Sequence, residues 1–156
     1  MIEVSIPGFA HLRLLHLLID FNGTLAMKGA LVPGAAWRLR KLAELLEVHV
    51  LTADTFGKAS QELKDLPLKL TIAPPGDQAE AKLHYLRKLG ETGVVAIGNG
   101  RNDARMVAEA ALGIGLIQRE GAAGTLLAAA DIVALDVRDA LDLLLHPMQL
   151  VATLRA

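Results

Sequence analysis

Short aliphatic runs, each followed by a stretch with helical periodicity, recur along almost the whole chain. They are bounded by Gly, Asp or Thr and occupy residues 14–19, 48–51, 69–72, 94–97, 113–117 and 132–135. Continuous apolar runs of this length are typical of strands buried on both faces of a parallel sheet. A further run at residues 2–6 predicts an edge strand ahead of them.

The segments between these runs have the pattern of amphipathic helices. Ala35, Leu39, Leu42 and Leu46 are spaced by four, three and four residues, and Pro33-Gly34 precedes them. Further helices are expected at residues 55–64, 78–89, 102–110, 122–129 and 137–144. Because strands alternate with helices, the chain is expected to form a doubly wound α/β fold with a mainly parallel sheet and helices on both faces.

Length and composition favour one domain over residues 1–156. No repeat, low-complexity tract or linker divides the chain, and 156 residues is an ordinary domain size. Hydrophobic residues make up 53% of the chain but aromatic residues only 3%, so aliphatic side chains and alanine must fill the core.

Charge and apolar patterning exclude several classes of partner. Sixteen basic and seventeen acidic residues leave a formal charge of −1, which provides no field to attract nucleic acid. The apolar stretch at residues 12–19 is interrupted by Arg13 and His16, so it fits neither a signal peptide nor a membrane span. We therefore expect a cytoplasmic protein with no membrane partner.

Cysteine and histidine usage gives no sign of a metal centre. The absence of cysteine rules out a disulfide framework and thiolate ligands. The histidines have no spacing typical of metal ligands, and we interpret them as surface residues or as satisfied strand and helix residues. They are His11, His16, His49, His84 and His146.

Polar clusters follow several predicted strands at the carboxyl ends, where ligands gather in open α/β sheets. Asp20 directly follows the first core strand, and its carboxylate could attack phosphorus to form an acyl-phosphate. Gly23 would let the backbone approach a ligand closely. The alternative is that Asp20 and Thr24 merely cap a turn.

The second cluster, Thr52-Ala53-Asp54, follows the next strand. The Thr52 hydroxyl and the following backbone amides could hold phosphate oxygens near a helix start. Thr and Asp are also common helix caps, so an ordinary N-cap is the favoured interpretation of Thr52 and Asp54 when this cluster is taken alone.

Lys82 lies on the apolar stripe of its predicted helix, so it is expected to point inward among aliphatic neighbours. A buried ammonium group needs an acidic or phosphate partner, which Asp20 and a bound phosphate would supply. The alternative is a lysine whose head reaches solvent.

A glycine-rich loop with three polar side chains follows the strand at residues 94–97. Asn99, Asn102 and Asp103 supply oxygen atoms that suit magnesium. A turn capped by Asn102 or Asp103 at the start of the next helix is the alternative.

These clusters, in this order, resemble the haloacid dehalogenase superfamily, whose pattern is an aspartate loop, a Ser or Thr, a Lys and an acidic loop. The resemblance covers most of residues 14–135. Three segments are more narrowly similar to the phosphorylation domain of P-type ATPases: Asp20-Phe21-Asn22-Gly23-Thr24, Leu51-Thr52-Ala53-Asp54 and Gly98-Asn99-Gly100-Arg101-Asn102-Asp103.

The resemblance implies a role for each cluster. It implies a catalytic group of Asp20 as nucleophile with Asn22 and Lys82, and phosphate binding by Thr52, Ala53 and Lys82. It implies Mg²⁺ held by Asp20, the Asn22 carbonyl and Asn99, with Asp103 contributing from the same loop as Asn99. It implies supporting roles for Thr24, Asp54 and Asn102.

Two residues depart from the superfamily pattern. Asn22 stands where its phosphatases usually have an acid/base aspartate, and Asn99 stands where an acidic metal ligand is usual. The interval between Asp20 and Thr52 is also shorter than the roughly 50 residues that a domain needs, so a transporter's nucleotide domain cannot be inserted there.

The leading hypothesis is a capless, magnesium-dependent phosphohydrolase or phosphotransferase acting through an aspartyl-phosphate on Asp20. An open site would suit a phosphorylated small molecule or a phosphoprotein, or a homo-oligomer in which a second subunit completes it. The alternative is a phosphate-binding regulatory module with little turnover, because Asn22 and Asn99 replace acids. A third interpretation is a detached phosphorylation domain that docks on a separate transporter subunit.

Overall fold

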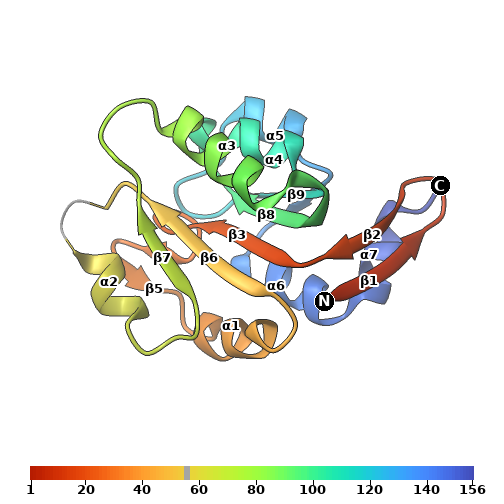
Figure 1. The fold of residues 1–156 in the computed structure, drawn as a ribbon, viewed down its shortest axis with the longest axis horizontal. Helices are drawn as coiled ribbons and strands as arrows, with labels where there is room; N and C mark the ends of the chain where they lie inside the picture. Colours follow the sequence, from red (N-terminus) through yellow and green to blue (C-terminus); the bar gives the residue numbers. More distant parts are fainter. Residues whose placement is uncertain (55–56) are drawn as a thin grey trace.

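The computed structural model, which describes residues 1–54 and 57–156, is built around a six-stranded parallel sheet (Figure 1). Its strands are β3 (His16–Asp20), β6 (Glu47–Thr52), β7 (Lys69–Ile72), β8 (Val94–Gly98), β9 (Leu112–Leu116) and β10 (Ile132–Ala134). Their spatial order is β10-β9-β8-β3-β6-β7. The chain builds outward from β3 to β7, returns to β8 beside β3, and then builds outward to β10. The carboxyl ends of β3 and β8 therefore flank the point where the winding reverses, which is the usual ligand position in such sheets.

Helices cover both faces of this sheet (Figure 1). One face carries α3 (Gln78–Leu89), α4 (Ala104–Glu109) and α5 (Gly124–Ala129), and the other carries α1 (Ala35–Ala43) and α6 (Val137–Leu145). Along β3, Leu17 and Ile19 belong to one core cluster and Leu18 to the other. Successive strand side chains point to opposite faces, so a strand covered on both sides needs a continuous apolar run. The predicted doubly wound α/β fold is confirmed.

Two strands precede the central sheet and form a hairpin of their own. Strand β1 (Ile2–Ile6) pairs antiparallel with β2 (Ala10–Leu14), and α7 (Pro147–Leu154) packs against β1 beyond the amino end of β3 (Figure 1). The predicted strand at residues 2–6 is confirmed, but it is not an edge of the central sheet. Neither β2 nor α7 was predicted as a separate element.

The predicted strand at residues 14–19 begins two residues too early. Strand β2 ends at Leu14 and β3 begins at His16, so Leu15 lies between the two strands. The Leu15 N–H donates to Gly93 O at 2.8 Å and its carbonyl accepts from Glu47 N at 2.9 Å. These bonds end β2 at Leu14 and let β3 begin in a new direction at His16.

The connections around β6 are short. Residues 21–34, all of them described, form the small hairpin of β4 (Ala26–Met27) and β5 (Ala30–Leu31), and no cap is inserted there. After β6, α2 (Lys58–Leu63) and β7 lead to α3. The predicted helix at residues 55–64 is observed as α2, and residues 55–56 lie outside the described part.

Other boundaries agree closely with the sequence patterns. Helix α3 has the predicted bounds, and the Asp77 side chain caps it by accepting from Glu80 N at 3.1 Å. The segment predicted as a helix at residues 102–110 begins instead as a 3₁₀ turn, η2 (Arg101–Asp103), ahead of α4; a second such turn, η1 (Glu91–Gly93), precedes β8. Across residues 1–54 and 57–156, no helix has the length and hydropathy needed to cross a bilayer.

Candidate active site

A buried lysine between two aspartates lies at the carboxyl end of the central strand. Asp20 is the last residue of β3 and is 8% exposed. The Lys82 ammonium, carried by α3, donates to Asp20 Oδ1 at 2.8 Å and to Asp103 Oδ1 at 2.7 Å. Lys82 is only 2% exposed, so its head does not reach solvent. The inward-pointing lysine expected from the helical stripe is thus observed, together with its acidic partners.

The loop after β8 holds Asp103 in place. Asp103 Oδ2 accepts from Asn99 N at 3.1 Å and from Gly100 N at 3.0 Å. A Cβ on Gly98 would lie 2.4 Å from Asp103 Cγ, so only glycine lets the carboxylate fold back against the strand end. Asn102 Oδ1 is 3.5 Å from the Lys82 ammonium nitrogen. The turn-capping interpretation therefore describes Asp103 correctly, and the same carboxylate also binds Lys82.

Burial and like charge act together on Asp20. Removal from water and the neighbouring Asp103 carboxylate raise the pKa of Asp20 from 3.8 to about 7, although Lys82 opposes this. The two carboxylates raise the pKa of Lys82 despite its burial, so the lysine stays charged. With one ammonium between two acids, the site carries an excess of negative charge whenever Asp20 is ionised, and a further cation would relieve it.

Oxygen atoms from two loops converge beside Asp20. The Thr24 hydroxyl oxygen is 3.3 Å from Asp20 Oδ2 and 3.3 Å from Asn99 Oδ1. Its single proton can be donated to only one of them at a time. Gly23 has a φ of 76°, and a Cβ there would lie 2.8 Å from Asn99 Nδ2, so the aspartate loop packs directly on Asn99. This set of oxygen donors fits the preference of Mg²⁺.

The predicted phosphate loop makes its own local contacts. Asp54 N donates to Thr52 Oγ1 at 3.3 Å, and Asp54 Oδ2 accepts from Ala59 N at 2.8 Å, which caps α2. The β3–β6 register pairs Asp20 with Leu51, so Thr52 ends the neighbouring strand one residue further on. Within the described residues, no hydrogen bond joins this loop to Asp20. The capping role of Asp54 is observed, and phosphate binding by Thr52 and Ala53 stays a prediction.

Asn22 differs from its neighbours because it is exposed. Its backbone forms a bridge with Ala26, which closes the turn after Asp20. An exposed amide at this position can accept or donate hydrogen bonds but cannot release a proton as a carboxylic acid does.

Two residues of the site were missed by the sequence analysis. Gln118 Nε2 donates to the carbonyls of Gly23 and Thr24, each at 3.0 Å, and its Oε1 accepts from Val137 N at 2.8 Å. Glu120 is exposed, and its Oε2 would lie 2.7 Å from a Cβ on Gly23. Both residues follow β9. The search for polar residues directly after predicted strands could therefore have found them if it had included this strand.

The chain is similar in sequence to an archaeal protein. No protein-family model matches the chain. The uncharacterized protein MJ0073 from Methanocaldococcus jannaschii is 43% identical over 84 residues, which cover 51% of this chain and 90% of that protein.

Several solved structures share the fold. The 3-deoxy-D-manno-octulosonate 8-phosphate phosphatase of Moraxella catarrhalis, crystallised with magnesium, phosphate and KDO, has a TM-score of 0.71 at 19% identity, covering 89% of this chain and 90% of its own. The cobalt-bound Haemophilus influenzae phosphatase of the same type has a TM-score of 0.72 at 15% identity, covering 90% and 92%. A Legionella pneumophila structure assigned to HAD superfamily subfamily III A has a TM-score of 0.71 at 18% identity, covering 90% and 86%. These similarities show that the chain has the haloacid dehalogenase fold.

Proposed function

We propose that this chain, which belongs to the same family as the Methanocaldococcus protein and has the haloacid dehalogenase fold, is a phosphohydrolase or phosphotransferase acting through an aspartyl-phosphate on Asp20. The fold hosts many functions, so the argument depends on the site. One observation carries this proposal. Asp20, the last residue of β3, is nearly buried and accepts a hydrogen bond from the buried Lys82, which also donates to Asp103.

The proposed reaction has two displacements at phosphorus. An Asp20 carboxylate oxygen attacks the phosphoryl group, and the bond from phosphorus to the leaving oxygen breaks. A water or acceptor hydroxyl then attacks the same phosphorus and loses its proton to solvent, while the bond from phosphorus to the Asp20 oxygen breaks. The products are the free carboxylate and either inorganic phosphate or the phosphorylated acceptor. Lys82 lies close enough to Asp20 to balance negative charge on the transferred group, and Asp103 orients Lys82.

A divalent cation suits this site because the converging donors are oxygens and the acids outnumber the lysine. Asp20, Asn99 and the Asn22 carbonyl would hold Mg²⁺, which supplies charge neutralisation for the phosphoryl group. Both carboxylate oxygens of Asp103 already accept hydrogen bonds, so its contribution is to position the loop and Lys82. Glu120 adds a nearby carboxylate that partly compensates for the amide of Asn99.

The expected substrates are phosphate compounds whose leaving groups need no protonation. Asn22 cannot act as a general acid, which favours acyl phosphates and aryl phosphates over alkyl phosphates. The Moraxella phosphatase is named for a phosphorylated sugar acid, which supports a phosphorylated small molecule as one substrate class. A phosphoprotein is the other candidate substrate class, because an open site without a cap between β3 and α1 suits a bulky substrate.

A screen with acetyl phosphate and p-nitrophenyl phosphate, with and without Mg²⁺, tests this function. Wild-type protein should turn over at least one of them in a metal-dependent way, and Asp20→Asn should lose that activity. Asp65→Asn, an exposed aspartate outside the site, is the matched control and should retain it. Binding of a phosphate analogue without any turnover would support the regulatory module instead.

A further inference from the structure

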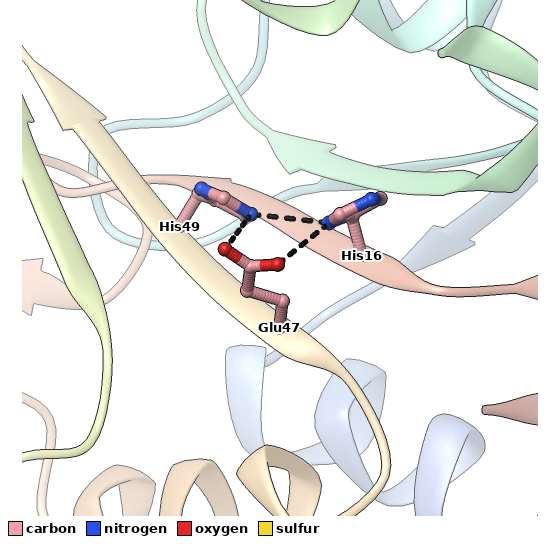
Figure 2. A group of neighbouring side chains, drawn as sticks. All are labelled: His16, Glu47 and His49. Carbon is pink, nitrogen blue, oxygen red and sulfur yellow. Dashed lines mark hydrogen bonds and ion pairs between the residues drawn. The ribbon is translucent and has the colours of Figure 1, made fainter. Parts of the chain in front are cut away.

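A second cluster of chemistry-bearing side chains lies at the opposite end of the same strands (Figure 2). His16 is the first residue of β3, and Glu47 is the first residue of the adjacent β6. The parallel register pairs His16 with Glu47 and Leu18 with His49. Because alternate strand residues share a face, all three side chains point to the side of the sheet that α3 covers.

The three side chains direct their polar atoms toward one another. His16 Nδ1 is 3.2 Å from His49 Nε2, and both nitrogens are 3.7 Å from a carboxylate oxygen of Glu47 (Figure 2). Two neutral imidazole nitrogens this close can share only one proton between them. A metal cation suits this arrangement better than a shared proton does, because it can accept a lone pair from each imidazole nitrogen and one from the carboxylate.

These distances match a known coordination geometry. Zinc binds histidine nitrogen at about 2.0–2.1 Å and carboxylate oxygen at about 2.0–2.2 Å, and tetrahedral angles then separate the ligand atoms by about 3.3–3.5 Å. The two histidine nitrogens are 3.2 Å apart, which is close to that range. His16 Nδ1 is 3.7 Å from Glu47 Oε2 and His49 Nε2 is 3.7 Å from Glu47 Oε1, so a small rotation of the exposed Glu47 side chain would direct one oxygen at the position between the nitrogens. Imidazole ligands also favour first-row transition metals over Mg²⁺.

We propose that His16, Glu47 and His49 form a Zn²⁺ site with three protein ligands, separate from the phosphoryl site at Asp20. The fourth position would face a cavity of about 210 Å³, which is also lined by Lys69, Tyr85 and Lys88 and has room for a water ligand.

A residue outside the ligand set orients one of the imidazoles. The His49 Nδ1 atom lies 2.9 Å from the Tyr85 hydroxyl, which can accept a hydrogen bond from Nδ1–H and so leave the Nε2 lone pair directed at His16. Metal-bound histidines typically have such a partner on the other ring nitrogen. His49 is 2% exposed, so its ring is fixed by packing as well.

Neighbouring cations compete with metal for this site. Lys69 forms an ion pair with Glu47, and Lys88 lines the same cavity. Lys69 is exposed and can swing away from Glu47, whose own side chain is 41% exposed. The ion pair therefore weakens metal binding without blocking it.

The three proposed ligands lie on β3 and β6, and the hydrogen bond between Tyr85 and His49 connects the site to α3. Tyr85 and Lys82 are three residues apart on α3, so they lie on the same helical face. Lys82 contacts the carboxyl end of β3 while Tyr85 contacts His49 near the amino end of β6. Zinc at His16, Glu47 and His49 is thus expected to stabilise the packing that also positions Lys82.

Calorimetric titration of chelator-treated protein with ZnCl₂ tests the proposal without measuring phosphatase activity, so its outcome is independent of the proposed function. In excess Mg²⁺, which occupies the proposed site at Asp20, wild-type protein should bind one equivalent of Zn²⁺, and Zn²⁺ should raise its melting temperature. Glu47→Gln and His16→Asn, which change less buried positions than His49, should each weaken binding by more than about 10-fold. His84→Ala, an exposed histidine of α3, is the matched control and should bind as wild type does.

A gain-of-affinity variant keeps the test decisive if a ligand variant fails to fold. Lys69→Met removes the competing ammonium and should tighten Zn²⁺ binding by about 10-fold. Bound Co²⁺ should show the visible absorption of a tetrahedral site in wild type and not in Glu47→Gln. The proposal is overturned if Zn²⁺ does not bind, or if it binds equally well to wild type, Glu47→Gln and Lys69→Met, since the ion would then be held elsewhere.

Discussion

Polar clusters lie at the two ends of β3 on the same face of the sheet, but their charged groups are arranged differently. At the carboxyl end, a buried ammonium lies between Asp20 and Asp103. At the amino end, two imidazoles face each other, burial lowers the pKa of His49, and the lone carboxylate of Glu47 is paired with an exposed lysine. The first arrangement is rich in oxygen donors and negative charge, whereas the second offers nitrogen lone pairs.

This difference follows from where each residue lies along the strand. His16 and Asp20 are four residues apart on β3, which corresponds to about 13 Å. Leu18, between them on the same face, is fully buried. A buried apolar residue therefore separates the two clusters, so the two proposed cation sites share no ligand.

The largest expected effect is on stability and comes from removing the buried ammonium. Lys82→Met leaves two buried carboxylates unpaired, which should lower the free energy of unfolding by about 3–5 kcal/mol near neutral pH. Urea titration would measure it. Lys69→Met removes an exposed lysine from the other cluster and should change stability far less. Equal losses in both variants would mean that the two ends do not differ in the way their charges are buried.

The next effect concerns catalysis at the carboxyl end. Asn22→Asp supplies a general acid near the leaving group and should accelerate alkyl phosphate turnover by about 10²-fold, with a smaller gain for aryl phosphates. Steady-state kinetics on both classes would measure this. Mass spectrometry of the loop peptide must show that Asn22 of the wild type has not deamidated. Equal rates on both classes, with chemistry rate-limiting and no gain in the variant, would place the proton donor elsewhere.

The pH dependence of stability separates Asp20 from an ordinary surface acid. Its folded-state pKa is raised from 3.8 to about 7, so between these values the folded protein retains a proton that the unfolded chain has released. The contribution of Asp20 to the unfolding free energy therefore falls as pH rises through this window, by up to about 1.4 kcal/mol per pH unit.

Asp20→Asn cannot titrate, so in EDTA its stability relative to wild type should rise from about pH 4 to about pH 7. Urea titrations of both proteins across this window would measure the difference, in which other ionisable groups largely cancel. A difference that stays constant or falls with pH would show that the Asp20 pKa is not raised.

The smallest effect tests the link through α3. Tyr85→Phe removes one hydrogen bond to His49 and should lower the unfolding free energy by about 1 kcal/mol in metal-free protein. Thermal unfolding in EDTA would measure this loss. A loss larger than that of Lys82→Met would mean that the amino end contributes more to the attachment of α3 than the buried ion pairs do.

Local patterns predicted the parts of the molecule that depend on neighbouring residues. The stripe around Lys82 predicted an inward lysine, because helix periodicity alone decides which face a residue occupies. Asp20 and the loop from Asn99 to Asp103 were proposed as site residues from their positions directly after apolar runs, and their convergence at one strand end is observed. The central strands and most helices were placed by the same means.

Features that depend on register between distant segments were missed. His16 and His49 are 33 positions apart and meet only because β3 and β6 pair as they do. The contact of Gln118 with the aspartate loop likewise joins segments more than 90 positions apart. The break at Leu15 depends on hydrogen bonds to Gly93 and Glu47, which no local apolar pattern encodes.

The central claim is that Asp20 becomes phosphorylated, and trapping that intermediate tests it most directly. Protein incubated with acetyl phosphate and Mg²⁺, quenched in acid and digested, would be analysed by mass spectrometry for a phosphoryl group on the peptide that contains Asp20. We predict that wild-type protein and Asp65→Asn carry the group on Asp20 and that Asp20→Asn does not. Phosphoryl transfer to a different residue, or metal-dependent turnover that persists in Asp20→Asn, would contradict the account.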